Sequence, residues 1–157
     1  MKLTFNDIVN ATNAQVLQCQ GTPEELIIST DSRSITKNDV YLPLKGERFD
    51  GHDFIESALK NGAKGYITAD KSLIFDGAGF VLYVEDTLRA YLQIAQFYKN
   101  KINPITIAIT GSSGKTTTKE MMASVMAEGY KIHKSPLNHN NEIGLCQTML
   151  SLSLIHI

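Results

Sequence analysis

The sequence predicts an α/β protein: a small N-terminal α/β domain followed by the beginning of a second domain built on a doubly wound parallel sheet. Short apolar, β-branched runs alternate with helix-like segments along the first part of the chain, which favours alternating strands and helices. A further strand-like run at residues 105–110 ends in a glycine-rich turn and resumes as a helix. Between the two parts, residues 99–104 are polar and end in a proline, which is typical of a domain boundary. We therefore expect domains at residues 1–102 and 103–151.

Composition and charge argue against several classes of protein. The chain has 157 residues, of which 43% are hydrophobic and 20% are charged, as in soluble globular proteins. A net charge of −1 gives no electrostatic case for binding nucleic acid or an anionic membrane. No apolar run approaches the roughly 18 residues that span a bilayer, and the N-terminus lacks the features of a secretory signal. We expect a cytoplasmic monomer in which Cys19 and Cys146 are reduced thiols.

Capping signals and apolar runs define the elements of the N-terminal domain. Thr4 and Asp7 fit the start of a helix that ends near Asn13. Strands are expected at residues 26–28, 40–44, 65–69 and 80–84, and helices at residues 53–61 and 87–100.

Two polar segments follow the first two of these strands. Residues 30–33, with the sequence TDSR, offer hydroxyl and guanidinium donors that suit a phosphate-bearing or carbonyl-rich ligand. Taken alone, the same residues also fit a solvated turn capped by the aspartate. His52 lies in the second segment, a Gly/Asp-rich loop in which a lone histidine is typically structural or solvated. No partner nucleophile accompanies it, and we assign it no chemistry.

The strand, turn and helix at residues 105–120 predict a phosphate-binding loop. Small residues let backbone N–H groups surround phosphate oxygens, and the next helix directs its positive N-terminus at the anion. Lys115 would reach the β- and γ-phosphates and the Thr116 hydroxyl would bind magnesium, so these two are the expected catalytic residues and ATP and Mg²⁺ the expected cofactors. The nucleotide-binding set is Gly111, Ser112, Ser113, Gly114, Lys115, Thr116 and Thr117.

After the loop we expect a helix at residues 116–128, a strand at 131–135, and a further loop and helix from residue 136. The first of these helices would bury the side that carries Met121, Met122, Val125 and Met126.

The loop has the form TGSSGKTTTKE, with Ile109 where the general phosphate-loop pattern has a glycine. A Gly/Ser turn with an incidental lysine is the alternative interpretation. The form present here resembles the ATP loop of the Mur ligases, which join amino acids or dipeptides to the cell-wall precursor UDP-N-acetylmuramate. Folylpolyglutamate synthases and cyanophycin synthetases have similar loops, so the loop alone leaves the family open.

A second, independent resemblance covers residues 30–65. The series DSRS…DVY.PLKG…DGHDFI…A…GA.G resembles the uridine-diphosphate-binding N-terminal domain of Mur ligases, which folylpolyglutamate synthases lack. It implies that the uridine and its pyrophosphate are held by Ser32, Arg33, Lys45, Gly46, Asp50, Gly51 and His52. The later segment N.NNEIG resembles the family's segment between the ATP and the muramoyl-peptide, and implies substrate contacts from Asn138, Asn140 and Asn141. The family usually has a proline where this chain has Cys146.

Together these motifs imply an ATP-dependent ligase that forms an amide through an acyl-phosphate intermediate. The resemblance is greatest to the members that add D-alanyl-D-alanine to UDP-N-acetylmuramoyl-tripeptide. The open alternatives are a nucleotide- or UDP-sugar-binding fragment without turnover, a Mur ligase for another residue, and a small phosphate-loop kinase. The last would leave residues 30–65 unexplained.

The end of the sequence also raises an expectation. The family's magnesium-binding acid, modified lysine and amine-substrate domain would lie beyond residue 157, which suggests an incomplete chain. Residues 152–157, LSLIHI, match the translation of a transposon-based sequencing adapter, and we expect them to be a non-native tail. An ordinary apolar helix end is the alternative.

Overall fold

The computed structural model describes residues 3–47, 49–136, 139 and 141–152. Its centre is a five-stranded sheet with the strand order β1-β5-β4-β3-β2. The strands are β1 (Gln15–Cys19), β2 (Ile27–Ser29), β3 (Asp39–Tyr41), β4 (Gly65–Thr68) and β5 (Phe80–Tyr83). Strands β2 to β5 run parallel, and β1 lies antiparallel to β5 at one edge.

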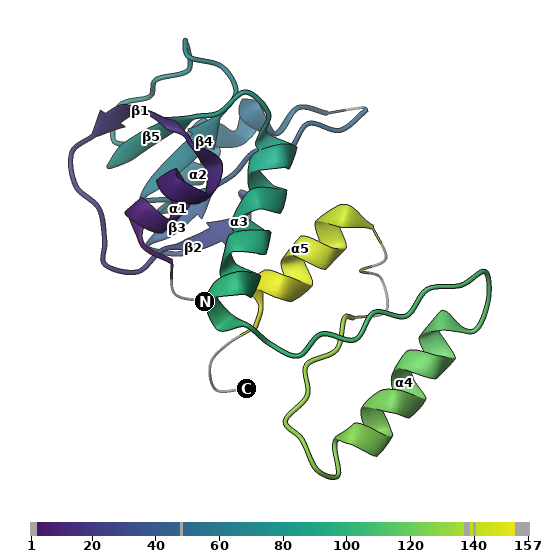
Figure 1. Ribbon diagram of the computed structural model, residues 1–157. Coiled ribbons are helices and arrows are strands. Elements are labelled where there is room, and N and C mark those ends of the chain that lie inside the picture. The colour runs from purple at the N-terminus through teal and green to yellow at the C-terminus, as the bar shows by residue number, and fades with distance from the viewer. Residues whose placement is uncertain (1–2, 48, 137–138, 140, 153–157) are drawn as a thin grey trace.

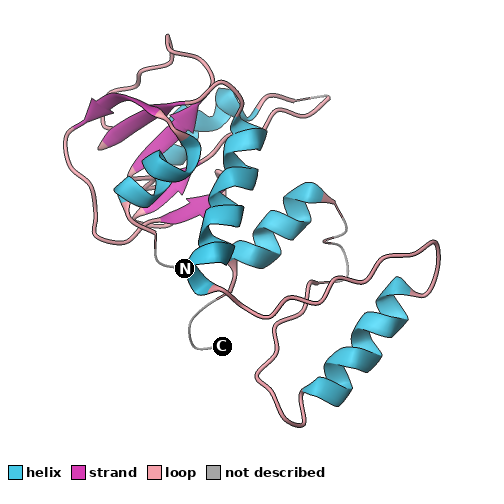
Figure 2. Cartoon of the chain, in the orientation of Figure 1, coloured by secondary structure: helices cyan, strands magenta, loops and turns pink. Residues whose placement is uncertain are grey.

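Helices cover both faces of this sheet (Figure 1). One face carries α1 (Phe5–Thr12) and α3 (Thr87–Ile102), with α5 (Glu142–Leu150) packed against α3. The other face carries a 3₁₀ turn, η1 (Gly51–Phe54), that leads into α2 (Ile55–Lys60). The remaining helix, α4 (Lys115–Met126), stands apart from the sheet between two long loops (Figures 1 and 2).

The strands form this three-layer arrangement because their side chains alternate between two apolar clusters. In β3 and just after it, Val40 and Leu42 join the cluster under α1, α3 and α5, whereas Tyr41 joins the cluster under α2. Strand β5 alternates in the same way, with Leu82 on the first side and Val81 on the second. Strands buried on both faces are typical of parallel sheets.

The prediction of an N-terminal α/β domain is confirmed, and so are its main elements. The N-terminal helix begins with a capping box, in which Thr4 and Asp7 bind each other's backbone N–H, and it ends at Asn13 in a left-handed conformation. Strand β1 was not expected. Gln15–Cys19 contains one β-branched residue, and it becomes a strand because its backbone pairs with the edge of β5.

The expected strands at residues 105–110 and 131–135 are wrong for the described chain, since neither segment is in a strand. Ile105 is 93% exposed and Ile107 is 51% exposed. A strand exists only where a neighbour accepts and donates its backbone hydrogen bonds, and no described segment pairs with either run. Sequence pattern reports the apolar alternation but not the presence of that neighbour.

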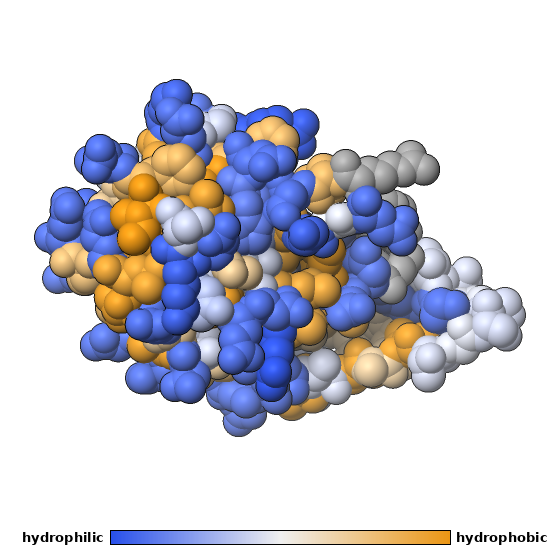
Figure 3. All heavy atoms as spheres, turned by 90° about the horizontal axis from the view of Figure 1, so that it is seen from above, coloured by the Kyte–Doolittle hydropathy of each residue, from blue (hydrophilic) through white to orange (hydrophobic). Residues whose placement is uncertain are grey.

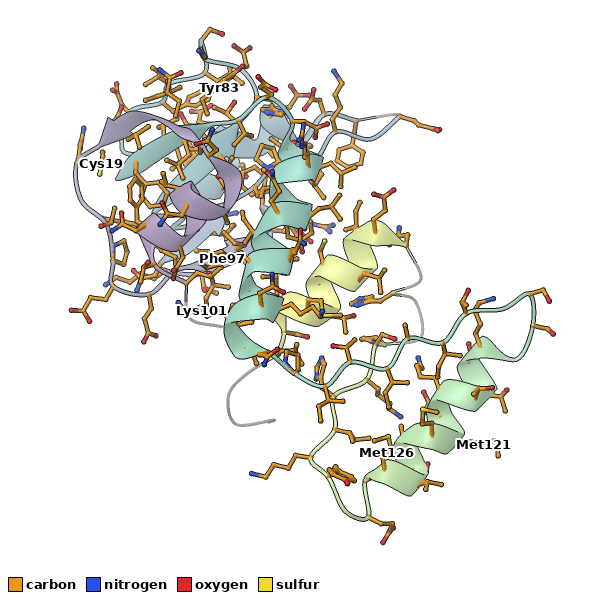
Figure 4. The ribbon with its side chains drawn as sticks, viewed as in Figure 1. Cys19, Tyr83, Phe97, Lys101, Met121 and Met126 are labelled. Carbon is orange, nitrogen blue, oxygen red and sulfur yellow. The ribbon has the colours of Figure 1, made fainter. Side chains whose placement is uncertain are left out.

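The expected buried side of α4 is also wrong. Met121 is 65% exposed and Val125 is 74% exposed, and no residue of α4 is buried. Figure 4 shows Met121 and Met126 on a helix that contacts no sheet, and in Figure 3 hydrophobic side chains reach the surface at this end of the molecule. An apolar stripe on a helix is buried only when another element lies against it.

Helix α5 packs across the expected domain boundary. Cys146 and Leu150 lie in the same apolar cluster as α1 and α3, and the Tyr98 hydroxyl donates a hydrogen bond to the backbone oxygen of Leu152 at 2.8 Å. The domain limits and the non-native tail stay predictions. None of the helices in the described residues is both long and apolar enough to span a bilayer.

Candidate functional site

The expected phosphate-binding loop is an open turn that leads directly into α4. Gly111 and Gly114 have φ angles of 152° and 77°, conformations that side chains other than glycine's rarely adopt. Gly114 is the N-cap of α4 and offers no side-chain cap, so the first N–H groups of the helix face outward without a capping side chain. Such a helix N-terminus is a suitable site for an anion.

Lys115 folds back over this turn. Its Nζ donates a hydrogen bond to the Gly111 backbone oxygen at 2.5 Å, which holds the exposed ammonium group against the loop backbone. The neighbouring predicted residues, Ser112, Ser113, Thr116 and Thr117, are exposed. A phosphate at the loop would therefore meet backbone N–H groups, hydroxyls and one cation without rearrangement of a packed core.

Arg33 forms a charged pair at the carboxyl end of β2. Its Nε and Nη2 donate to the two carboxylate oxygens of Asp31 at 2.9 and 2.8 Å, and its backbone N–H donates to the same carboxylate at 3.0 Å. The side-chain hydrogen bonds from Arg33, followed by the backbone one, lower the pKa of Asp31 to about 2. The Arg33 side chain is 88% exposed, so the guanidinium is both oriented and accessible.

Ser32, by contrast, is buried. Its backbone oxygen accepts a hydrogen bond from the Asn61 side chain at 2.9 Å, which joins the turn after β2 to the end of α2. Ser32 therefore helps to fix the turn after β2.

The second polar segment folds back on itself after β3. Lys45 and Asp50 form an isolated antiparallel bridge, and the Lys45 Nζ lies 3.5 Å from an Asp50 carboxylate oxygen. The Gly46 N–H donates to the Phe49 backbone oxygen at 3.0 Å, closing the turn. Gly51 fits tightly, because a Cβ there would lie 2.7 Å from the Leu44 backbone oxygen. The loop is thus held to the sheet on one side and leaves the Lys45 ammonium exposed.

His52 uses both ring nitrogens within the protein. Its Nδ1 lies 2.6 Å from the Asp50 carboxylate, and its Nε2 accepts the Ala69 backbone N–H at 3.1 Å. Since Nε2 accepts, Nδ1 carries the proton of the neutral ring. Hydrogen bonds from the His52 backbone and then its ring lower the pKa of Asp50. This geometry agrees with the interpretation of His52 as a residue that holds the loop, here to the end of β4.

The two polar segments lie at the same end of the sheet, where the parallel strands end. They follow β2 and β3, and Ala69 follows β4, so all lie at the carboxyl ends of parallel strands, where α/β sheets bind ligands. A groove of about 360 Å³ opens beside the turn after β2. Its walls are Ile27, Ile28, Ser29, Thr30, Asp31 and Ser34 on one side and Tyr91, Gln147, Leu150 and Ser151 on the other.

The groove adds residues that the sequence analysis missed. Gln147 and Ser151 face it from α5, more than a hundred positions away in sequence from the turn after β2. No local pattern marks them, because their proximity arises only from the packing of α5 against α3.

Asn141 is the described member of the asparagine segment, since Asn138 and Asn140 lie outside the described residues. Its Oδ1 accepts the Gly144 N–H at 2.8 Å, which makes it the N-cap of α5. The amide nitrogen is the half of the side chain that remains to face a ligand.

Polar contacts connect α4 with the segment that leads to Asn141. The Lys119 Nζ donates to the Ser135 backbone oxygen at 2.7 Å, and Glu120 forms an ion pair with Lys134. The predicted ATP loop itself is separate from the predicted uridine-diphosphate residues, as the position of α4 in Figure 1 shows. The described residues contain no group of three or more His, Cys, Asp or Glu that could hold a metal ion.

Two models of known protein families match the sequence of this chain. A family model described as the Mur ligase catalytic domain matches residues 26–130, and one described as the Mur ligase middle domain matches residues 109–154. The chain belongs to the Mur ligase family. The first match covers most of the N-terminal sheet of this Mur ligase, and the two matches overlap at residues 109–130, which contain the glycine turn and α4.

Relatives extend the comparison over almost the whole chain. A Synechocystis protein named UDP-N-acetylmuramoyl-tripeptide--D-alanyl-D-alanine ligase is 40% identical over 99% of this chain and 35% of its own length. A solved UDP-N-acetylmuramoylalanyl-D-glutamyl-2,6-diaminopimelate--D-alanyl-D-alanyl ligase from Acinetobacter baumannii superposes with a TM-score of 0.86 at 33% identity, covering 98% of this chain and 34% of that one. The MurF ligase of Thermotoga maritima, solved in complex with ADP, superposes with a TM-score of 0.71 at 35% identity, covering 79% and 28%. This Mur ligase sequence therefore spans about a third of the length of the relatives it matches.

Proposed function

We propose that the protein to which this sequence belongs is an ATP-dependent ligase that joins D-alanyl-D-alanine to UDP-N-acetylmuramoyl-tripeptide. One observation carries the proposal: the chain combines an open phosphate-binding loop with a second, separate set of polar groups at the carboxyl edge of a parallel sheet. A phosphate-loop kinase would use the first and leave the second without a role. The name of the Synechocystis relative supports the choice of substrates.

The loop residues fit the phosphates of ATP. Gly111 and Gly114 shape the turn, and the Lys115 ammonium is held against the Gly111 backbone oxygen within it. The Thermotoga maritima relative was solved in complex with ADP, which supports the proposal that this loop binds an adenine nucleotide. The exposed Thr116 hydroxyl would contribute to holding Mg²⁺, which neutralises charge on the phosphates when bound.

In the proposed reaction, a terminal carboxylate oxygen of the tripeptide attacks the γ-phosphorus of ATP and ADP leaves. The dipeptide amine then attacks the acyl carbon, phosphate leaves, and the amine loses a proton as the amide forms. Lys115 and the loop amides would stabilise the negative charge on the transferred group, because a cation and N–H donors lower the energy of a phosphoryl group that gains charge in the transition state.

The N-terminal sheet would hold the other end of the acceptor. Arg33 and Lys45 present cations to the pyrophosphate, and the turns fixed by Ser32, Gly46, Asp50, Gly51 and His52 position them. Asn138, Asn140 and Asn141 would also contact the acceptor, through their side-chain amides. Binding the non-reacting uridine end would orient the distant carboxylate for phosphoryl transfer.

A reconstitution with the full-length gene product tests this function. ADP release is measured with UDP-N-acetylmuramoyl-tripeptide and D-alanyl-D-alanine together, and with each omitted. We expect product only when ATP and both substrates are present. Product with a single amino acid in place of the dipeptide would assign another member of the family. If UDP-linked substrate binds but no ADP is released, the protein is a binding module and the ligase proposal is wrong.

A further inference from the structure

Hydrogen bonds join His139, Thr148 and Gly144 at α5, and none of the roles above uses His139 or Thr148. The Thr148 hydroxyl, which is buried on α5, donates to the Gly144 backbone oxygen at 2.8 Å. That bond uses the single hydroxyl proton, so the Thr148 oxygen accepts its second bond from Nδ1 of His139, at 3.1 Å. His139 therefore carries its proton on Nδ1 when the ring is neutral.

The backbone of His139 is held at the same place by a second contact. A Cβ on Gly144 would lie 2.5 Å from the His139 Cα and 2.9 Å from its carbonyl carbon. The absence of a side chain at Gly144 thus lets the main chain of His139 rest directly on the first turn of α5. The ring contact and the backbone contact come from different atoms, and both place His139 over α5.

Asn141 completes the cluster. Its Oδ1 caps the helix through the N–H of Gly144, the same glycine whose carbonyl binds Thr148 and whose Cα faces His139. With the oxygen committed to Gly144, the amide nitrogen on the other side of the same planar group has its direction set by that bond. Gly144 therefore links the Asn141 amide to the His139–Thr148 pair through adjacent atoms.

We propose that His139 and Thr148 are positioning residues, whose hydrogen bond fixes the chain entering α5 and so presents the Asn141 amide to the UDP-linked acceptor. The inference rests on the proposed function for the identity of the acceptor. In this proposal both residues act through Asn141. They act by keeping one donor in place before the substrate arrives, which reduces the ordering cost of binding.

The first test is kinetic and uses Thr148→Val in the full-length enzyme, because valine keeps the shape and removes the hydroxyl. Losing one neutral hydrogen bond behind a substrate contact should raise KM for the acceptor about threefold to tenfold and leave KM for ATP unchanged. Thr148→Ser should restore the wild-type value. His139→Ala should match Thr148→Val, and the double variant should be no worse than either single one.

Thr12→Val is the matched control. The Thr12 hydroxyl is also buried in a helix and donates at 2.8 Å to the backbone oxygen four residues earlier, but it binds no histidine. We expect Thr12→Val to leave both KM values unchanged. An equal effect of the two valine variants, or a rise in KM for ATP as large as that for the acceptor, would overturn the proposal.

The second test separates this inference from the ligase function. Ring ¹⁵N chemical shifts of His139 in the present chain, with the imidazole neutral, should report the Nδ1–H form, and Thr148→Val should shift the ring toward Nε2–H. If Thr148→Val leaves the His139 ring shifts unchanged, the hydrogen bond between these two residues does not form, whether or not the enzyme is active. If the full-length wild type makes no amide while the ¹⁵N result holds, the proposed function fails and the His139–Thr148 bond stands.

Discussion

Arg33 and Asp31 form a closed pair, in which the Arg33 side chain binds both carboxylate oxygens and its own backbone N–H binds one of them. The residue between them, Ser32, is held to α2 through Asn61, so the pair is attached to a fixed turn. An exposed guanidinium is thereby kept in one orientation at the edge of the sheet.

The charge state of Asp31 should follow the pair. Its pKa of about 2 is below the ordinary 3.8, so the pair stabilises the folded chain above pH 3.8 and that contribution is lost as the pH falls through about 2. We expect an NMR titration of the Asp31 carboxylate to give a midpoint near the lower value. Arg33→Ala should move the midpoint upward. An unchanged midpoint in that variant would show that the pair does not form in solution.

Arg33→Lys should weaken UDP binding by the present chain about tenfold, because lysine cannot replace the planar, two-point contact of a guanidinium. Isothermal titration calorimetry measures the change. Lys37→Ala is the control. Lys37 is an exposed cation that precedes β3, at the amino ends of the parallel strands and away from Arg33. Equal loss in both variants would indicate a general charge effect and remove Arg33 from the site.

Lys115→Ala should reduce ATP-dependent ligation by the full-length protein at least about 100-fold, since it removes the ammonium group that is hydrogen-bonded to the loop backbone. Binding of UDP-N-acetylmuramoyl-tripeptide should stay close to wild type, because the residues proposed to bind uridine diphosphate lie on the separate sheet. The two quantities are measured by ADP release and by calorimetry. Retained turnover would remove Lys115 from the mechanism.

Gly51→Ala should destabilise the N-terminal domain by about 1–3 kcal/mol, because the added methyl group overlaps the Leu44 backbone. Gly21→Ala is the matched change, with no atom within 4 Å of the added carbon, and should alter the free energy of unfolding by less than about 0.5 kcal/mol. Urea denaturation compares the two variants. Similar stabilities would contradict the close packing of this loop.

Asn141→Asp and Asn141→Ala should separate helix capping from substrate binding. Aspartate keeps an N-cap acceptor for Gly144 but loses the amide donor, so we expect normal stability and weaker acceptor binding. Alanine loses both, and should also lower stability by about 1 kcal/mol. Thermal unfolding and acceptor titration give the two readouts. Normal acceptor binding by the aspartate variant would assign Asn141 to capping alone.

The N-terminal domain was predictable because its signals are local. Thr4 and Asp7 cap α1 with their own neighbours, and the strands around Val40 and Val81 carry enough apolar residues to be recognised without knowing their partners. The glycines of the loop before α4 were predictable for the same reason, since a positive φ is a property of one residue.

The remaining features depend on contacts between distant segments. The run at residues 105–110 has the pattern of a strand but finds no partner in the described chain, and Gln15–Cys19 lacks the pattern but finds one at β5. Composition and spacing determined that this chain alternates strands and helices, has a glycine turn before a helix at residue 115, and has polar segments after β2 and β3. Only the tertiary structure decided that α5 forms a wall of the groove, that both ring nitrogens of His52 are used, and that His139 rests on Gly144. The reason is physical: hydrogen bonds and burial join residues that are close in space, whereas a sequence pattern records only which residues are close along the chain.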